Sequence, residues 1–363
     1  MHKLKGREFD FRDLVSVDPT RVLRPLLLML ATMLAVSPAH AQTSAPSGMP
    51  QDSKSPENTK SLGERLFDVV SANNPKVYPG YRVNHAKGGL FKGVLTSSPN
   101  AASLTMAAHL QGTPVPMTIR FSNAGGVPDA PDNAPSAAIR AMAMTFQLPD
   151  GSSTDLMCIN MPFFVVPTPE EFIVFNKAVQ ASPPGSPKPT KAEEYIASHP
   201  ATKRFVTFPK PMPQSYGTET YFAIHAYKLI NAAGQSHYVR WRIVPEAGNA
   251  FRSADEAAKS APNALLDEMR ARVMQGPVKF RLQVQVADPS DVTNDPTVSW
   301  PDERPVVDLG EISVTSPVPN NEEAEKGIGF LPNKAMKGLE LSDDPFLAAR
   351  AAAYGVAYGK RNP

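Results

Sequence analysis

Two short segments of the chain combine residue types that can do acid–base or redox chemistry. In the first, Arg82 precedes His85 and a glycine pair begins at Gly88. An imidazole titrates near neutral pH, so it can move protons during a reaction. In the second, Arg350 and Tyr354 are four residues apart, a spacing that brings a guanidinium next to a phenol on a helix. Taken alone, each segment also has an ordinary interpretation, as a structural histidine or a surface arginine packed over a tyrosine.

Other chemistries find little support in the sequence. The chain has a single cysteine, Cys158, so it can form neither an internal disulfide nor a cysteine-rich metal site. It contains no phosphate-binding loop, no dinucleotide fingerprint and no paired histidines at helical spacing. Its net charge is +2 with both signs scattered, which does not favour nucleic-acid binding.

The elements that position these residues are expected to be mostly strands. Alternating or apolar runs bounded by turn residues predict strands at 116–123, 141–148, 220–229, 236–244, 278–286 and 305–314. Amphipathic spacing and capping residues predict helices at 62–72, 170–180, 193–199, 254–272 and 344–359. This pattern predicts an α+β fold, in which antiparallel strands form a barrel or curled sheet flanked by helices.

The N-terminal segment, 1–41, has the layout of a secretory signal peptide. Two arginines precede an apolar run at 26–36, and small residues then form a cleavage pattern. The run is too short to span a bilayer, so we expect no stable membrane insertion. A leader at 42–60, rich in serine, proline, glutamine and lysine, is expected to be flexible, and a core domain follows at 61–363. This organisation predicts a periplasmic protein.

Several further segments complete a series that runs from about residue 74 to 358. Arg82-Val-Asn-His85-Ala-Lys-Gly is similar to an Arg-Val-Val-His-Ala-Lys-Gly signature, and Arg120-Phe-Ser122 is similar to an Arg-Phe-Ser triplet. The other matches are Asp155-Leu156, Asn160-x-Pro162-x-Phe164, Ile224-His225 to Asn231, Trp300-Pro301, Phe330-x-Pro332-Asn333 and Leu347-x-x-Arg350-x-x-x-Tyr354. In this order the series resembles the catalase family, which implies a catalase-type antiparallel β-barrel with a haem pocket.

The resemblance implies haem b as the cofactor and assigns one side of it to the C-terminal segment. Tyr354 matches the phenolate that binds the haem iron in catalases. A phenol ionises only near pH 10 in water, and a nearby cation favours its ionised form. Arg350 matches the family's arginine in this role, and His225 matches a histidine on the same side of the barrel.

On the opposite, distal side, the resemblance assigns catalysis to His85. This histidine is expected to move a proton between the two oxygens of the peroxide, and Ser122 is expected to fix the ring by a hydrogen bond. Arg82 and Arg120 match arginines that bind the haem propionates as charge-assisted pairs. Phe172 matches an aromatic residue that lies over the distal face of the haem.

The sequence departs from the family where a second peroxide would bind. The family's distal asparagine aligns with Ile159, and Asn160 follows it; an alternative alignment makes Asn160 the catalytic asparagine. Ala138 stands where the family has the acidic residue of its main channel. Met142 and Met144 are expected to make the distal approach still more apolar. An apolar residue cannot hydrogen-bond peroxide, so dismutation should be weakened more than cleavage of the O–O bond.

These features favour a peroxidase that reduces hydrogen peroxide or organic hydroperoxides with a small-molecule electron donor and has low catalase activity. Nine residues follow Tyr354, so we expect the protein to resemble the small catalase-related peroxidases, without the long C-terminal extension of full catalases. We therefore expect a monomer or homodimer. Two alternatives stay open: rearrangement of lipid hydroperoxides, as in allene oxide synthases, and an exported haem-binding protein.

Overall fold

The computed structural model describes residues 60–362. The predicted signal peptide, 1–41, and all but the last residue of the predicted leader, 42–60, lie outside the described residues. Residues 61–362 belong to the predicted core domain.

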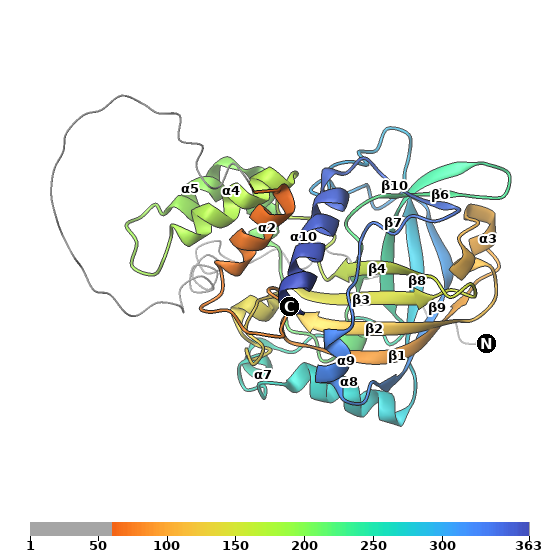
Figure 1. The fold of residues 1–363 in the computed structure, drawn as a ribbon, viewed down its shortest axis with the longest axis horizontal. Coiled ribbons are helices and arrows are strands. Elements are labelled where there is room, and N and C mark those ends of the chain that lie inside the picture. The colour runs from red at the N-terminus through yellow and green to blue at the C-terminus, as the bar shows by residue number, and fades with distance from the viewer. Residues whose placement is uncertain (1–59, 363) are drawn as a thin grey trace, which may run out of the picture.

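Eight antiparallel strands close into a barrel (Figure 1). In spatial order they are β1 (Gly88–Ser97), β2 (Val115–Asn123), β3 (Arg140–Gln147), β4 (Ser153–Ile159), β5 (Tyr221–Phe222), β7 (Ser236–Pro245), β8 (Val278–Val286) and β9 (Val306–Pro317). β9 pairs with β1 and closes the ring. Two short strands, β6 (Tyr227–Ile230) and β10 (Leu339–Leu341), extend the sheet from β7. The predicted α+β barrel is confirmed.

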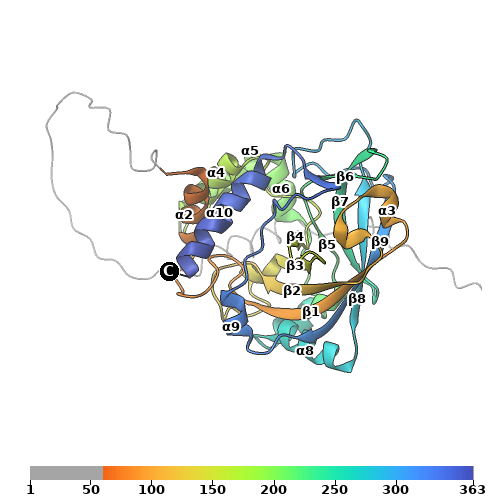
Figure 2. The ribbon, with the colours of Figure 1, turned by 45° about the vertical axis from the view of Figure 1, so that its right-hand side comes forward.

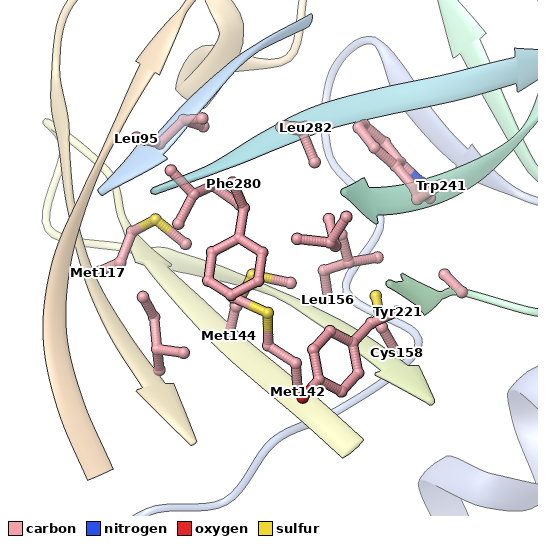
Figure 3. Close-up of a cluster of buried hydrophobic side chains, with 14 of the residues drawn as sticks. Leu95, Met117, Met142, Met144, Leu156, Cys158, Tyr221, Trp241, Phe280 and Leu282 are labelled. Atoms are coloured by element: carbon pink, nitrogen blue, oxygen red, sulfur yellow. The ribbon is translucent and has the colours of Figure 1, made fainter. Parts of the chain in front are cut away.

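Alternation along the strands decides which side chains fill the barrel. Successive residues of a strand point to opposite faces, and in β3 the interior positions are Met142, Met144 and Phe146, all fully buried. Figure 3 shows the two methionines inside the barrel. Their predicted place on the distal approach was therefore wrong, because the residues of β3 that face outward are the small Ala141 and Ala143.

The helices gather mainly on one side of the barrel. α10 (Pro345–Arg361) lies between the barrel and a pair formed by α2 (Leu62–Ser71) and α4 (Pro169–Gln180) (Figures 1 and 2). α2 approaches α10 closely at Gly63, where a Cβ atom would come within 2.8 Å of the backbone of Ala352. The remaining helices are α3 (Ala101–Leu104), α5 (Lys191–Ser198), α6 (Pro200–Thr207), α7 (Ala254–Ala258), α8 (Ala264–Gln275) and α9 (Asn321–Lys326).

The start of α10 is fixed by its N-cap residue. The Asp344 side chain accepts a hydrogen bond from the backbone N–H of Phe346 at 2.9 Å, which satisfies a donor at the free N-terminus of the helix. Pro345 occupies the first helical position, where its missing N–H costs nothing. No helix in the described part of the chain is both long and apolar enough to cross a membrane.

Some predicted elements differ in detail from the structure. The predicted helix 254–272 is two helices, α7 and α8, because Pro262 in the intervening segment cannot continue α7. The predicted strand 220–229 is likewise divided into β5 and β6. β1 was not predicted, since three glycines weaken the strand pattern of its sequence. These differences leave the placement of the candidate site residues unchanged.

Candidate active site

His85 lies in the loop before β1 and has a backbone φ of 55°, in the left-handed region. This conformation is costly for a residue other than glycine, on the order of 1–3 kcal/mol, so the surrounding structure must hold it. The ring Nδ1 lies 3.1 Å from the Ser122 hydroxyl, and the backbone carbonyl accepts a hydrogen bond from Arg120 Nη2 at 3.0 Å. The next residue, Ala86, donates its N–H to the Gly125 carbonyl at 3.0 Å.

The bond to Ser122 leaves Nε2 as the ring nitrogen that is available for a substrate. Burial, together with the positive charges of Arg120, Arg350 and Arg82, lowers the pKa of His85 to about 3. His85 is therefore neutral across the physiological range and can accept a proton. The predicted pairing of His85 with Ser122 is present in the structure.

Ser122 belongs to a row of residues that crosses three strands on the outer face of the barrel. It pairs with Ala141 of β3, which in turn pairs with Ile159 of β4. Residues that face each other across a ladder point to the same side of the sheet, and strands are roughly 4.8 Å apart. Ile159 is thus on the His85 side of the sheet, roughly 10 Å from Ser122. An apolar residue therefore lies on the face of the sheet that His85 contacts through Ser122.

The next row on the same face contains Arg120, Ala143 and Met157. Arg120 is buried. Partial exposure is shared by the other members of the two rows beyond β2, which are Ala141, Ile159, Ala143 and Met157. Ala141 and Ala143 project only methyl groups from the middle of this face.

Three arginines from distant parts of the chain meet at one edge of this face. Arg82 Nη2 and Arg361 Nη2 both donate to the Ile328 carbonyl, at 3.0 Å and 2.8 Å. Arg120 Nε and Arg82 Nη2 form ion pairs with the Glu325 carboxylate at 2.6 Å and 3.2 Å. Burial lowers the pKa of Arg82 to about 9, with a further lowering by Arg120 and an opposing effect of Glu325. Three cations around one carboxylate make a strongly anion-attracting cluster.

The cluster depends on a glycine at the start of β1. A Cβ atom at Gly88 would come within 2.6 Å of the Arg120 guanidinium, so any side chain there would displace it. The glycine pair noted in the sequence therefore makes room for an arginine that binds both the His85 carbonyl and Glu325.

Arg350 and Tyr354 lie together on α10, as predicted from their spacing. Arg350 Nη2 donates to the Tyr354 hydroxyl oxygen at 2.9 Å. Behind them, His225 Nδ1 lies 2.7 Å from Asp344 Oδ2, and both side chains are almost completely buried. His225 Nε2 has no hydrogen-bond partner among the described residues. The phenol is thus bound by a guanidinium, and the buried pair of His225 and Asp344 lies close enough to influence the charge of Arg350.

Asn160 is engaged away from His85. Its Oδ1 accepts from the Arg140 backbone N–H at 3.0 Å, and its Nδ2 donates to Glu219 at 3.1 Å and to the Ala138 carbonyl at 3.2 Å. Arg140 and Glu219 form a buried ion pair at 2.6 Å. These bonds tie both ends of the Asn160 amide to the region of Arg140, whereas Ile159 lies in the row of Ser122.

Phe172 of α4 belongs to an aromatic group beside α10. Its ring stacks on Phe164, with centroids 5.8 Å apart and planes 13° apart. Phe346, one turn before Arg350, packs edge-on against Phe164 at 5.0 Å and Phe172 at 6.5 Å. Apolar rings therefore line the part of the site between α4 and the start of α10.

Three functional positions were missed in the sequence. Arg361 lies seven residues after Tyr354, about two helical turns on, so the spacing alone places it on the same face of α10. Phe164 was present in a matched motif but was given no role. Glu325 gave no signal, because nothing in its local sequence shows that two distant arginines reach it.

Comparisons with known proteins agree with this geometry. The family model described as Catalase matches residues 66–362. The chain is 37% identical to a catalase-related peroxidase of Mycolicibacterium paratuberculosis over 282 residues, covering 77% of this chain and 88% of that protein. It is 33% identical to a catalase-related peroxidase of Synechococcus elongatus, covering 78% and 84% of the two chains.

More distant relatives are longer. The chain is 26% identical to catalase isozyme 2 of Nicotiana plumbaginifolia and covers 58% of that protein. Among solved structures it is similar to a bacterial catalase, with a TM-score of 0.68, 21% identity and coverage of 92% of this chain and 69% of the other. This last similarity establishes the barrel fold.

The fold, the site and these matches together define an oxidoreductase that acts on peroxide. The chain belongs to the catalase family. Its relatives include both full-length catalases and shorter proteins named catalase-related peroxidases.

We predict that the rate of reaction with peroxide shows no inflection from His85 near pH 6.5. As pH falls, a proton on His85 would remove the acceptor, but burial postpones protonation to about pH 3. Stopped-flow measurement of the bimolecular rate between about pH 5 and 8 should give a flat profile. The exposed His237 provides a control through His237→Gln. A step near pH 6.5 that persists in this variant would contradict the prediction.

Proposed function

We propose that this protein is a haem-dependent peroxidase that reduces hydrogen peroxide or organic hydroperoxides with an external small-molecule donor, and that it dismutates peroxide poorly. The observation that carries the proposal is the row Ser122–Ala141–Ile159. Ser122 in this row holds His85, and the residue two strands away on the same face is the apolar Ile159. Cleavage of one peroxide is supported, whereas binding of a second peroxide as reductant is not.

The described residues fit haem b. Tyr354, with its phenol held by Arg350, would bind the iron. Arg82, Arg120 and Arg361 carry two more positive charges than Glu325 balances, which matches the two haem propionates. The small side chains of the β3 alanines suit a flat ring. Bound haem would supply the redox-active iron at which the O–O bond is broken.

The protein's own residues would manage the proton. Neutral His85 can accept a proton at Nε2 from one oxygen of the peroxide and return it to the other oxygen, which leaves as water or an alcohol. Ser122 holds the ring by Nδ1 and so keeps Nε2 directed at the substrate. The strained backbone of His85 is consistent with a residue held in place for this purpose.

Dismutation requires a second peroxide to be held and oxidised. Ile159 offers no donor or acceptor, so this peroxide has no anchor beside His85. The aromatic group of Phe164, Phe172 and Phe346 adds apolar surface nearby. Such surroundings favour organic hydroperoxides and organic reductants over a small, strongly hydrated molecule.

The cofactor assignment predicts the effect of Tyr354→Phe. Wild-type protein titrated with haem should give the absorption spectrum of a tyrosinate-bound ferric haem. Loss of the ligand should change this spectrum and weaken binding by about tenfold or more, equivalent to at least 1.4 kcal/mol. Tyr358→Phe, one turn further along α10 and exposed, is the matched control and should behave as wild type. Equal spectra for wild type and Tyr354→Phe would exclude Tyr354 as the ligand.

The reaction is tested with haem-loaded protein, a phenolic donor and an oxygen electrode. We expect donor-dependent consumption of peroxide and little oxygen evolution. Ile159→Asn should raise the rate of oxygen evolution by about tenfold, because the added amide can hydrogen-bond the second peroxide and such a bond is worth on the order of 1–2 kcal/mol. Ile159→Leu keeps an apolar side chain at this position and should leave the rate of oxygen evolution low.

The alternatives give different results in the same assay. Wild-type oxygen evolution at the rate of a full catalase would falsify the proposal. Consumption of a fatty-acid hydroperoxide without any donor would support a rearrangement instead. Haem that binds but never reacts with peroxide would support a binding protein.

We further propose that the protein is exported and processed after Ala41. The apolar run at 26–36 and the small residues that follow it support this. Mass spectrometry of protein recovered from the periplasm should show an N-terminus at Gln42. A full-length chain found only in the cytoplasmic fraction would overturn the proposal.

A further inference from the structure

Glu325 is the carboxylate that holds the arginine cluster together. Its Oε1 accepts from Arg120 Nε at 2.6 Å, and its Oε2 accepts from Arg82 Nε at 3.3 Å. The side chains of Arg82 and Glu325 are less than one-fifth exposed, and that of Arg120 is 4% exposed. Within residues 60–362, no other carboxylate forms an ion pair with these two arginines.

The helix that carries Glu325 is fixed to the barrel. Asn321, at the start of α9, accepts a hydrogen bond from the Leu90 backbone N–H at 2.7 Å and reaches the Gly88 carbonyl at 3.4 Å. Leu90 and Gly88 lie on β1, and Leu90 pairs with Arg120 on β2. The carboxylate and the arginine that it binds are thus anchored to the same part of the sheet.

The bonds to Glu325 use a particular edge of each guanidinium. Arg120 donates a hydrogen bond from Nε to the Glu325 carboxylate and another from Nη2 to the His85 carbonyl. Arg82 donates a hydrogen bond from Nε to the same carboxylate and another from Nη2 to the Ile328 carbonyl. Among the described residues, neither Nη1 has a hydrogen-bond partner. Each guanidinium is therefore held on two sides, with one N–H-bearing edge left for a ligand.

The charges of the cluster are balanced only with a dianion. Arg82, Arg120 and Arg361 carry three positive charges, and Glu325 supplies one negative charge. Two further carboxylates would neutralise the group. Burial lowers the pKa of Arg361, and the charge of Arg120 lowers it further, whereas Glu325 raises it. Without Glu325, three partly buried cations would repel one another before any ligand arrives.

We propose that Glu325 is a positioning residue for haem binding: it holds Arg82 and Arg120 by their Nε edges, so that their remaining edges meet the two propionates. This inference rests on the proposed haem-dependent function. In the simplest competing role, the Glu325 carboxylate binds the arginines only until the haem propionates displace it. The two roles predict opposite effects of removing the carboxylate.

The test compares Glu325→Gln with Glu322→Gln in the full haem-free chain. Glu322 lies on the same helix, is exposed and has no ion pair with the cluster. Each protein is titrated with haem and with haem dimethyl ester, in which both propionate charges are masked. If Glu325 positions the arginines, Glu325→Gln should weaken haem binding by about tenfold, as when one partner of a buried charge pair is removed. Binding of the dimethyl ester should change less than twofold.

The outcomes are distinct. Tighter haem binding by Glu325→Gln would overturn the proposal in favour of competition. Equal weakening for haem and its ester would also overturn it, because Glu325 would then act only on the general stability of the site. If Glu325→Gln cannot be purified in folded form, Glu325→Asp, which withdraws the carboxylate by one methylene, must show the same selectivity. Failure of the wild-type chain to bind haem would count against the proposed function itself.

Discussion

A closed, filled barrel is the constraint on which the rest of this structure depends. Closure leaves no free edge in the ring, and the interior is packed with large apolar side chains such as Met142, Met144 and Phe280 (Figure 3). Side chains of the core therefore occupy most of the space inside the barrel. The candidate site residues Arg120 and Ser122 lie instead on the outer face of β2, and α10, at the far end of the chain, carries Arg350 and Tyr354.

Buried polar contacts connect the two sides of the site to the framework. Asp344 caps α10 and also binds His225, so the start of the helix and the base behind Arg350 share one carboxylate. On the distal side, Arg120 joins the His85 backbone to α9 through Glu325. Positions that are far apart in the sequence are fixed relative to each other by a few charge-assisted bonds. Such bonds explain how a strained histidine backbone is maintained.

The sequence predicted the local parts of the site better than the parts made by long-range contacts. Arg350 and Tyr354 could be paired because helical spacing brings them together, and Ser122 could be assigned to His85 through the resemblance of both motifs. The orientation of Met142 and Met144 was wrong, since alternation fixes two faces of a strand but does not say which one is inside. Glu325 could not be found, because its role comes from two arginines more than 200 residues away in the chain.

The neighbouring residues Ile159 and Asn160 divide two duties between adjacent positions. Asn160 is committed to the buried pair of Arg140 and Glu219, and a change there would disturb the framework. Ile159 points to the outer face and takes no part in that network. The identity of residue 159 can therefore vary during evolution at little expense to folding. On the proposed function, a substitution at residue 159 changes the reaction and leaves the contacts of Asn160 with Arg140 and Glu219 in place.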